Sequence, residues 1–324
     1  MRRVFLAAAA VLAMSPLAVL AEAAYPSKPV TVIVPYPPGG TNDNVARLIA
    51  KKVSDKAGQP FVIDYKAGAG GTIGAAHVAQ AKPDGYTLLN ASIGNLAIAP
   101  QLIKVNYDPI KSFDSVAFIG NGITTFAVRP GFPAKNLQEF VSYAKANPGK
   151  VTIGTSGVGT PGHVAGEYFQ QLAGIQLVHV PYKGSSPAVS DAVAGHVDLV
   201  IDPLSTTFVR EGRLKALAYF GSDQPPEGVK GVASVASQGY PQWTAAMGGS
   251  FFWTAPTGLP PAVRDKLTRW VLEALADPEV QQALVHVQVK PEPLGAAATT
   301  DKVREMHKIA QGVLNASVSV ANAR

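Results

Sequence analysis

Apolar runs and glycine-rich turns alternate along the chain in two stretches that share one order of elements. The run Val30–Val34 is continuous and rich in β-branched residues, as in a strand buried inside a parallel sheet. Val45, Ile49 and Val53 then recur at the spacing of one helix face. The first stretch predicts a strand, loop, helix, strand, loop, helix and strand at about 30–34, 35–41, 45–53, 61–63, 66–71, 72–81 and 86–89.

The second stretch repeats this order of elements. Its first helix carries Val164, Tyr168 and Leu172 on one face, again at helical spacing. Its second helix is followed by Gly195, a residue type that is favoured just past a helix end. The same seven elements are predicted at about 151–153, 154–162, 164–172, 177–180, 181–186, 187–194 and 197–201.

The duplicated pattern predicts an α/β fold with two lobes. Each β-loop-α-β-loop-α-β stretch implies parallel strands joined by right-handed crossovers. Open α/β sheets bind ligands beyond the carboxyl ends of their strands, so four glycine-rich loops would surround one cleft. We expect lobe 1 to contain residues 24–122 and 250–324, and lobe 2 to contain residues 123–249.

The remaining segments are expected to complete the first lobe and to form a hinge. An aromatic strand is predicted over 249–254, with helices over 261–275 and about 300–314. Two strands, near 117–128 and 248–254, would cross between the lobes.

The first residues form a secretory signal rather than a part of the fold. Arg2 and Arg3 precede an apolar, alanine-rich run over 4–20, and Ala21-Glu22-Ala23 fits a small-x-small cleavage site. We expect cleavage before Ala24. A membrane anchor is the alternative interpretation, but the run is shorter than the ~20 residues that span a bilayer. No later segment approaches that length, so we expect a soluble mature protein.

Composition supports a two-domain globular protein and excludes several classes of function. The chain has 324 residues, 47% hydrophobic and 15% charged, with a net charge of +6 that becomes +5 when residues 1–23 are removed. Its basic residues are scattered, so nucleic-acid binding is not indicated, whereas the mild positive charge is compatible with anionic ligands. The absence of cysteine excludes thiolate nucleophiles and cysteine metal sites.

Glycine-rich loops that run into helices are suited to bind anions. Their backbone N–H groups are free, the helix dipole adds partial positive charge, and glycine allows close approach. Thr41, Thr72 and Thr160 lie at or near such helix starts. Two interpretations stay open for each hydroxyl, a helix cap or a hydrogen bond to a carboxylate.

Five other polar residues near the loops have both a structural and a functional interpretation. Asp43 either stabilises the first turn of its helix as an acidic residue or contacts an amine or hydroxyl of a ligand. Asp202 lies at the end of a predicted strand, where it forms a hydrogen bond either with a ligand or with the other lobe. His163 is expected to be neutral near a helix start. Lys66 and Lys183 are either solvated or paired with a carboxylate.

Catalytic and cofactor motifs fail on inspection. The segment 157–162 matches G-x-G-x-x-G, but the next strand ends without the acid that a dinucleotide site needs. The segment 154–158 lacks the final glycine of a nucleophile elbow. The six histidines are dispersed, and neither H-E-x-x-H nor a Walker A motif is present. We therefore expect a protein that is not an enzyme, with no cofactor, no metal and no catalytic residue.

Many short motifs in one order give the chain a family resemblance. From about residue 25 to the C-terminus it resembles the Bug family, the extracytoplasmic substrate-binding receptors of tripartite tricarboxylate transporters. The motifs are Tyr25-Pro26-Ser27-Lys28-Pro29, 35–43, Gly68-Ala69-Gly70-Gly71, 83–88, Tyr107-Asp108-Pro109, 156–163, Val180-Pro181-Tyr182-Lys183-Gly184 and Gly195-His196-Val197-Asp198.

The resemblance implies a type II periplasmic-binding-protein fold, or Venus flytrap, with two hinge-crossing strands. It implies a monomeric periplasmic receptor that binds a small organic carboxylate, partly through backbone groups and ordered waters, and passes it transiently to the membrane subunits of a tripartite tricarboxylate transporter. Carried over by motif, the ligand-binding residues are Tyr36, Gly40, Thr41 and Asp43 in the first loop, Ala67, Gly68, Ala69 and Gly71 in the second, and Ser156, Thr160, His163, Tyr182 and Asp202 from the opposite lobe.

Two departures from the family pattern bear on ligand choice. The family usually has Phe where this chain has Tyr36, and Asn-Arg where it has Tyr65-Lys66. Tyr36 adds a hydroxyl, and Lys66 keeps the positive charge. Candidate ligands are dicarboxylates, aromatic carboxylates, acidic amino acids and nicotinate-like compounds.

Other functions remain as alternatives. A ligand-loaded partner of a two-component sensor is the first of them. A periplasmic hydrolase that uses Ser156 and His163 is more remote, as is a scaffold without a ligand.

Overall fold

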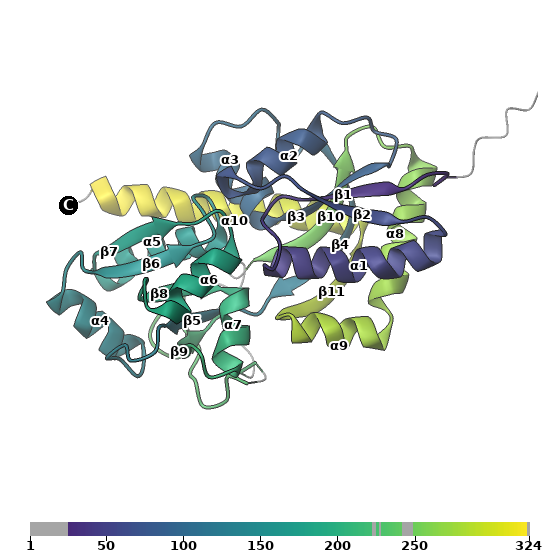
Figure 1. The fold of residues 1–324 in the computed structure, drawn as a ribbon. Helices are drawn as coiled ribbons and strands as arrows, with labels where there is room; N and C mark the ends of the chain where they lie inside the picture. The colour runs from purple at the N-terminus through teal and green to yellow at the C-terminus, as the bar shows by residue number, and fades with distance from the viewer. Residues whose placement is uncertain (1–24, 222–224, 227, 242–248, 323–324) are drawn as a thin grey trace, which may run out of the picture.

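The chain forms two α/β lobes side by side (Figure 1). The computed structural model describes residues 25–221, 225–226, 228–241 and 249–322. The predicted signal segment over 1–23 lies outside these residues. Among the helices that are described, none combines the length and the apolar character of a membrane span.

The first lobe is built on a six-stranded mixed sheet. Its strand β1, next to the edge strand β2, is the predicted Val30–Val34 run, and four of its five residues are buried. β1 pairs in parallel with the strands on both sides, and the other pairings are antiparallel. The strand order is β11 (Val289–Gly295), β4 (Phe113–Gly122), β10 (Ser250–Pro256), β3 (Thr87–Ser92), β1 and β2 (Phe61–Tyr65).

The second lobe is built on a five-stranded mixed sheet. Three strands at one side of this sheet are parallel, and the two at the other side are antiparallel to their neighbours. The strand order is β7 (Leu177–Pro181), β6 (Val151–Thr155), β8 (Leu199–Asp202), β5 (Thr125–Val128) and β9 (Lys215–Tyr219).

The duplication predicted from the sequence is confirmed in the strand order. In each lobe the first strand of the repeated stretch lies between the second and the third, as β2-β1-β3 and as β7-β6-β8. The predicted parallel units are therefore present, but each sheet is extended by antiparallel strands. Those strands pair segments far apart in the sequence, such as β4 with β10, which local periodicity does not reveal.

Helices cover both faces of the first sheet because alternate strand residues point to opposite sides. Val30 and Val32 pack with one group of helices, and Ile33 packs with the other. The first group is α1 (Thr41–Ala57), α8 (Pro261–Leu275) and α9 (Pro278–His286). The second group is α2 (Thr72–Ala79), the π-helix η2 (Gly94–Ile98) and α10 (Ala296–Asn322).

The second sheet is covered in the same way. Phe126 and Ile153 pack against α4 (Leu137–Ala146) and α5 (Pro161–Ala173) on one face. Ala127 and Val200 pack against the helices of the other face. These helices are α6 (Ser185–Ala194) and α7 (Pro203–Arg210).

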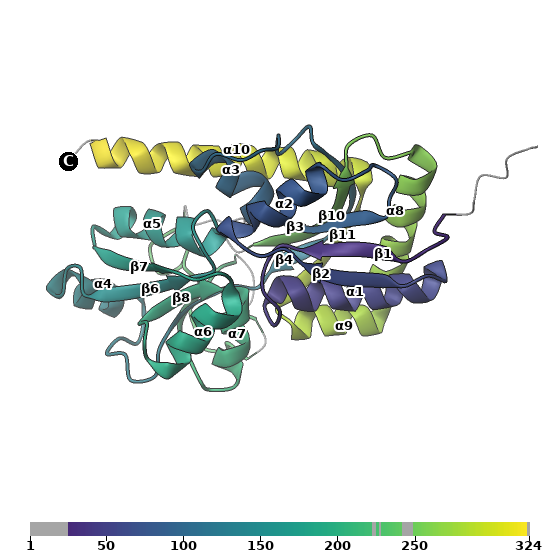
Figure 2. The same ribbon diagram turned by 45° about the horizontal axis from the view of Figure 1, so that its top comes forward.

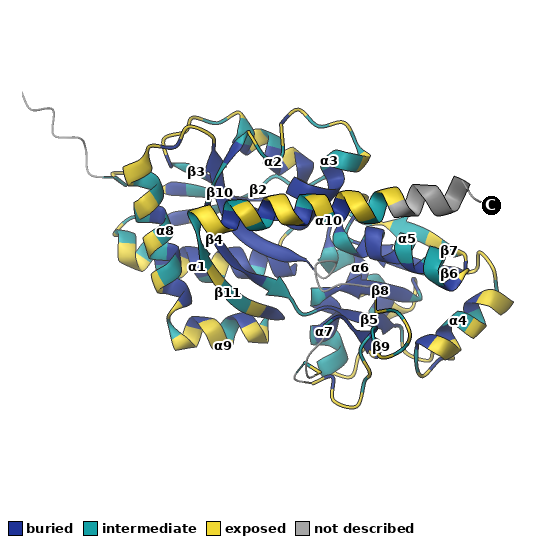
Figure 3. Cartoon of the chain, turned by 180° about the vertical axis from the view of Figure 1, so that it is seen from behind, coloured by how far each residue is buried: buried dark blue, intermediate teal, exposed yellow. Residues whose placement is uncertain are grey.

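The C-terminal helix α10 lies along both lobes (Figures 2 and 3). It contacts β4 and η2 in the first lobe and α5 in the second. Val303, Met306 and Ala310 are buried in an apolar cluster that also contains residues of α5. The sequence predicts a shorter helix at 300–314 within the first lobe, since its pattern cannot show that one helix serves two units.

The chain passes between the lobes at short crossings. β4 ends at Gly122 in the first sheet, and β5 begins at Thr125 in the second. On the return, Gly249 precedes β10, and its carbonyl oxygen accepts a 3.0 Å hydrogen bond from the N–H of Gly122. The two crossings are therefore hydrogen-bonded to each other beside the cleft.

Candidate functional site

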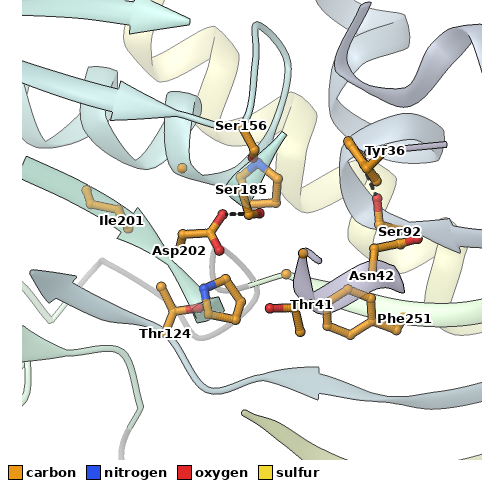
Figure 4. Close-up of a pocket in the computed structure, with 15 residues that line it drawn as sticks. Tyr36, Thr41, Asn42, Ser92, Thr124, Ser156, Ser185, Ile201, Asp202 and Phe251 are labelled. Carbon is orange, nitrogen blue, oxygen red and sulfur yellow. Dashed lines mark hydrogen bonds between the residues drawn. The ribbon is translucent and has the colours of Figure 1, made fainter. Parts of the chain in front are cut away.

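A cleft lies between the lobes where the carboxyl ends of β1, β3, β6 and β8 meet (Figure 4). Its empty volume, including the part that is open to solvent, is about 560 Å³. The first lobe lines it with Tyr36, Gly40, Thr41, Asn42, Ser92 and Phe251. The second lobe lines it with Ser156, Pro161, Gly162, Ser185, Ile201, Asp202 and Pro203, and the crossings add Thr124 and Gly249.

Four helices point their N-termini at this cleft. α1 begins at Thr41, α5 at Pro161, α6 at Ser185 and α7 at Pro203, and all four of these residues line the cavity. Helix N-termini carry partial positive charge and free N–H groups, so the cleft favours an anion. In the part of the chain that the structure describes, no lysine, arginine or histidine is among the lining residues. The attraction for an anion therefore comes from the backbone and from neutral hydroxyl groups.

Thr41 presents an unpaired hydroxyl at the start of α1. Its Oγ1 is buried without a hydrogen-bond partner, and the side chain does not cap the helix. Such a buried polar group is costly unless it has a partner. The helix-cap interpretation is therefore not met for this residue, and a contact with a ligand stays a prediction.

Thr72 and Thr160 are already engaged within their loops. Thr72 Oγ1 donates to the carbonyl oxygen of Ala69 at 2.9 Å, and Thr160 Oγ1 donates to that of Gly157 at 2.7 Å. Thr160 does not line the cavity. Both hydroxyls therefore stabilise loop conformation.

The first turn of α1 is fixed by a buried polar network. Asn90 Nδ2, on β3, donates to both the carbonyl oxygen and the side-chain oxygen of Asn42, at 2.9 and 3.0 Å. Trp253 Nε1, on β10, donates to Asn90 Oδ1 at 2.9 Å. This network aims the N–H groups at the start of α1 into the cleft.

Tyr36 joins the first loop to the second. Its hydroxyl donates to the carbonyl oxygen of Gly70 at 3.0 Å and pairs with Ser92 Oγ at 3.1 Å. Burial raises the pKa of Tyr36 to about 12, so the side chain is neutral at physiological pH. A Cβ on Gly71 would lie 2.9 Å from the Tyr36 ring, so this glycine allows the tyrosine to pack.

The second loop is shaped by its backbone. Residues 68–71 all have positive φ, including Ala69 at 47°, a conformation that favours glycine. None of the predicted residues Ala67, Gly68, Ala69 and Gly71 lines the cavity. In this arrangement the loop supports Tyr36, and its role as a direct ligand contact stays a prediction.

Asp202 is a buried carboxyl in the wall of the second lobe. Its Oδ2 accepts from Ser185 Oγ at 2.7 Å, its Oδ1 accepts from the N–H of Leu204 at 2.9 Å, and Ser156 is a further partner. Burial raises the pKa of Asp202 to about 6 although these three hydrogen bonds lower it. The carboxyl also caps α7.

Three further predicted residues lie outside the cavity lining, with partners of their own. Asp43 accepts from the N–H of Gly39 at 2.9 Å, from Arg47 and from Tyr65. His163 Nδ1 accepts from the N–H of Gly159 at 3.3 Å, and the ring lies 4.4 Å from that of His179. Tyr182 donates to Asp191 at 2.6 Å.

The two lysines that were predicted to be either solvated or paired with a carboxylate do not line the cleft. Lys66 pairs with Asp64 at 3.1 Å, and neither Lys66 nor Lys183 lines the cavity. The two residues of the hydrolase alternative also form hydrogen bonds with different partners. Ser156 is a partner of Asp202, whereas His163 accepts from Gly159.

The lobes touch across the cleft through glycines. A Cβ on Gly159 would lie 2.7 Å from the Cα of Ala99, and one on Gly184 would lie 2.6 Å from Cδ of Pro37. Each pair joins one lobe to the other, and only the bare backbone fits. The structure therefore shows a closed arrangement of the lobes.

Five of the residues predicted to bind the ligand line this cavity, and other lining residues were not predicted. The five are Tyr36, Gly40, Thr41, Ser156 and Asp202. Ser92 and Ser185 were missed, although Ser92 lies three residues past the strand predicted to end at 89 and Ser185 lies within the loop predicted at 181–186. Their hydroxyl side chains in these places are the signal that could have found them. The remaining missed residues are Asn42, Thr124, Pro161, Gly162, Ile201, Pro203, Gly249 and Phe251.

Comparison with known proteins gives a consistent result. Residues 45–315 match the family model described as the tripartite tricarboxylate transporter family receptor. Protein BugT of Bordetella pertussis is 34% identical over 284 residues, which cover 86% of this chain and 85% of BugT.

Solved structures agree with the family match. Rpa4515 of R. palustris with adipate has a TM-score of 0.85 at 30% identity, covering 90% of this chain and 98% of that one. MatC of Rhodopseudomonas palustris with bound malate has a TM-score of 0.84 at 31% identity, covering 89% and 99%.

Proposed function

Since the chain belongs to the tripartite tricarboxylate transporter family of receptors, we propose that it captures a small organic carboxylate in the cleft between its lobes. The periplasm is the site of action that the family implies, and membrane subunits of a transporter are the proposed recipient. The observation that carries the proposal is the convergence of four helix N-termini on a cavity whose described lining residues include no basic side chain.

The first lobe supplies the proposed carboxylate site. The start of α1 offers backbone N–H groups, and the Thr41 hydroxyl is buried beside them without a partner. A carboxylate here gains charge-assisted hydrogen bonds and the favourable end of a helix dipole. Tyr36 and Ser92 lie on the same wall, and Ser156 and Ser185 face them from the second lobe (Figure 4).

Lobe closure is the proposed response to the ligand. A ligand that bridges both walls stabilises the closed state in which those walls are close together. We propose lobe boundaries at 24–122 with 250–324 and at 123–249. The hydrogen-bonded crossings at Gly122 and Gly249 support a hinge at that place.

Calorimetric titration with a panel of carboxylates tests this function. We expect at least one small carboxylate to bind the unaltered chain and to raise its melting temperature. Gly40→Leu should abolish that binding, because residue 40 lines the cavity and a Cβ there already lies 3.6 Å from Ser185. Gln138→Leu, on the exposed side of α4, is the control that should leave binding intact. Unchanged affinity in Gly40→Leu would place the ligand elsewhere.

A further inference from the structure

Asp202 is the one carboxyl among the described residues that line the cleft, and the opposite wall is suited to receive an anion. Among the lining residues that the structure describes, only Asp202 and Tyr36 carry an ionisable side chain, and Tyr36 stays neutral up to high pH. Asp202 is only 9% exposed. Within the described part of the chain, no basic side chain lines the cavity to balance its charge.

In the second lobe, donors at the starts of two helices form hydrogen bonds with this carboxyl. Asp202 caps α7 through the N–H of Leu204, and Ser185 at the start of α6 donates to its other oxygen. On the first lobe, by contrast, Asp43 in the first turn of α1 lies outside the cavity lining and pairs with Arg47, while the hydroxyl of Thr41 has no partner. The two walls are therefore electrostatically unlike.

The carboxyl also keeps capacity to accept from a ligand. An ionised carboxylate has about four acceptor positions on its two oxygens. Three donors are accounted for, from Ser185, Leu204 and Ser156. In Figure 4 the carboxyl of Asp202 and the side chain of Thr41 approach the cavity from opposite sides.

We propose that Asp202 selects carboxylates whose far end carries a hydrogen-bond donor, such as a hydroxyl or an ammonium group, over those that end in a second ionised carboxylate. The inference rests on the proposed function, since it orients the ligand with its carboxylate at Thr41. A second negative charge beside Asp202 is repelled in a cavity where solvent screening is weak. A donor at the same place fills the remaining acceptor position.

The selection depends on pH in a defined direction. Burial raises the pKa of Asp202 to about 6, so the carboxyl is charged at pH 8 and largely protonated at pH 5. A protonated Asp202 donates a hydrogen bond and no longer repels a second carboxylate. Tyr36 does not titrate in this range, and burial lowers the pKa of His163 on the neighbouring helix α5. The preference is therefore strong at pH 8 and weak at pH 5.

Matched ligand pairs test the inference by calorimetric titration. The probes are 4-hydroxybutyrate and 4-aminobutyrate against succinate, and 6-hydroxyhexanoate and 6-aminohexanoate against adipate. At pH 8 we expect the donor-ended member of the pair that fits to bind at least tenfold more tightly than its diacid. Asp202→Asn should reduce that ratio at least tenfold, and asparagine is an equally good helix cap, so α7 is preserved. Asp191→Asn, outside the cavity, is the matched control.

Each outcome has a separate meaning. A diacid preference at pH 8, or a ratio that neither Asp202→Asn nor a shift to pH 5 alters, would overturn the role of Asp202 while leaving carboxylate capture intact. Failure of every probe to bind both the unaltered chain and Asp202→Asn would overturn the inference and the proposed function together. The pH series on the unaltered chain keeps the test valid if the variant folds poorly.

Discussion

Gly70 in the first lobe lies so close to the carbonyl oxygen of Val158 in the second lobe that no Cβ fits at position 70. The contact joins the glycine-rich turn at 68–71 to the loop between β6 and α5. Because these two loops belong to different lobes, the contact exists only when the lobes are closed. The side chain at position 70 therefore bears directly on the equilibrium between open and closed forms.

Gly70→Ala should shift this equilibrium toward the open form. We expect a larger radius of gyration in small-angle X-ray scattering with saturating ligand, and an affinity at least tenfold lower by calorimetry. Gly131→Ala is a matched control, since Gly70 and Gly131 have φ of 64° and 73° and both suffer left-handed strain of about 1 kcal/mol. No atom lies within 4 Å of a Cβ at position 131. Equal affinities in the two variants would exclude a role for the Gly70 contact in closure.

Tyr36→Phe should show whether the Tyr36 hydroxyl contributes to ligand affinity as well as to the stability of the fold. Loss of the hydroxyl removes the hydrogen bonds to Gly70 and Ser92, at a cost of roughly 0.5–1.5 kcal/mol in unfolding free energy. We also expect a three- to tenfold loss of affinity, about 0.7–1.4 kcal/mol, because Ser92 and the second loop lose a shared anchor. Tyr182→Phe is the control, since its hydroxyl donates to Asp191 outside the cavity. If both variants lose stability and neither loses affinity, the Tyr36 hydroxyl serves folding alone.

Thr41→Val should weaken ligand binding without weakening the unliganded protein. The hydroxyl has no partner, so its replacement by a methyl group removes a buried polar group and breaks no hydrogen bond. We expect an unchanged or higher melting temperature and an affinity about tenfold lower, the worth of one hydrogen bond to a charged group.

Thr72→Val is the comparison variant, and we expect it to give the opposite result to Thr41→Val. Its hydroxyl donates to Ala69, so the variant should lose stability and retain affinity. The two threonines occupy comparable places at helix starts, and the sequence left the same two interpretations open for both. A ligand affinity that is equal in Thr41→Val and the unaltered chain would show that Thr41 does not touch the ligand.

Local patterns were sufficient to predict the duplicated units. The Val30–Val34 strand is present with the predicted bounds, and both stretches form the predicted strand–helix repeats. Periodicity reports on burial of one segment at a time, so it could not show that β10 pairs with β3 and β4. It could not show either that α10 packs on both lobes.

Side-chain roles in the cleft were harder to predict than its position. Asp43 and Thr41 are two residues apart at the start of α1, yet Asp43 is held by Gly39, Arg47 and Tyr65 while the hydroxyl of Thr41 is free. The difference depends on β2, which brings Tyr65 beside Asp43. A motif alone contains no such tertiary information.

His179 should make the stability of the second lobe sensitive to acid. Burial, with a smaller effect of the adjacent His163, lowers the pKa of His179 from its ordinary value near 6.5 to about 4. Its Nε2 lies 2.7 Å from the hydroxyl of Thr155 on β6. Between pH 6.5 and 4 the unfolded chain binds a proton at this residue that the folded chain does not bind. Stability contributed by the neutral ring is therefore complete above pH 6.5 and is lost as the pH falls toward 4.

His179→Gln isolates this effect, because glutamine keeps a hydrogen bond to Thr155 and cannot be protonated in this range. Asp202 has a pKa raised to about 6 and acts in the opposite direction, since its stabilising contribution grows as the pH falls below 6. The unaltered chain and His179→Gln both contain Asp202, so the difference between their melting curves reports on His179 alone.

We expect the melting temperature of the unaltered chain to fall more steeply than that of His179→Gln from pH 6.5 to 4. Above pH 7 the two melting temperatures should differ by a constant amount. His77→Gln, at an exposed histidine, should follow the unaltered chain throughout. Parallel curves for His179→Gln and the unaltered chain across the whole range would mean that the ring of His179 accepts its proton as readily in the folded protein as in the unfolded one.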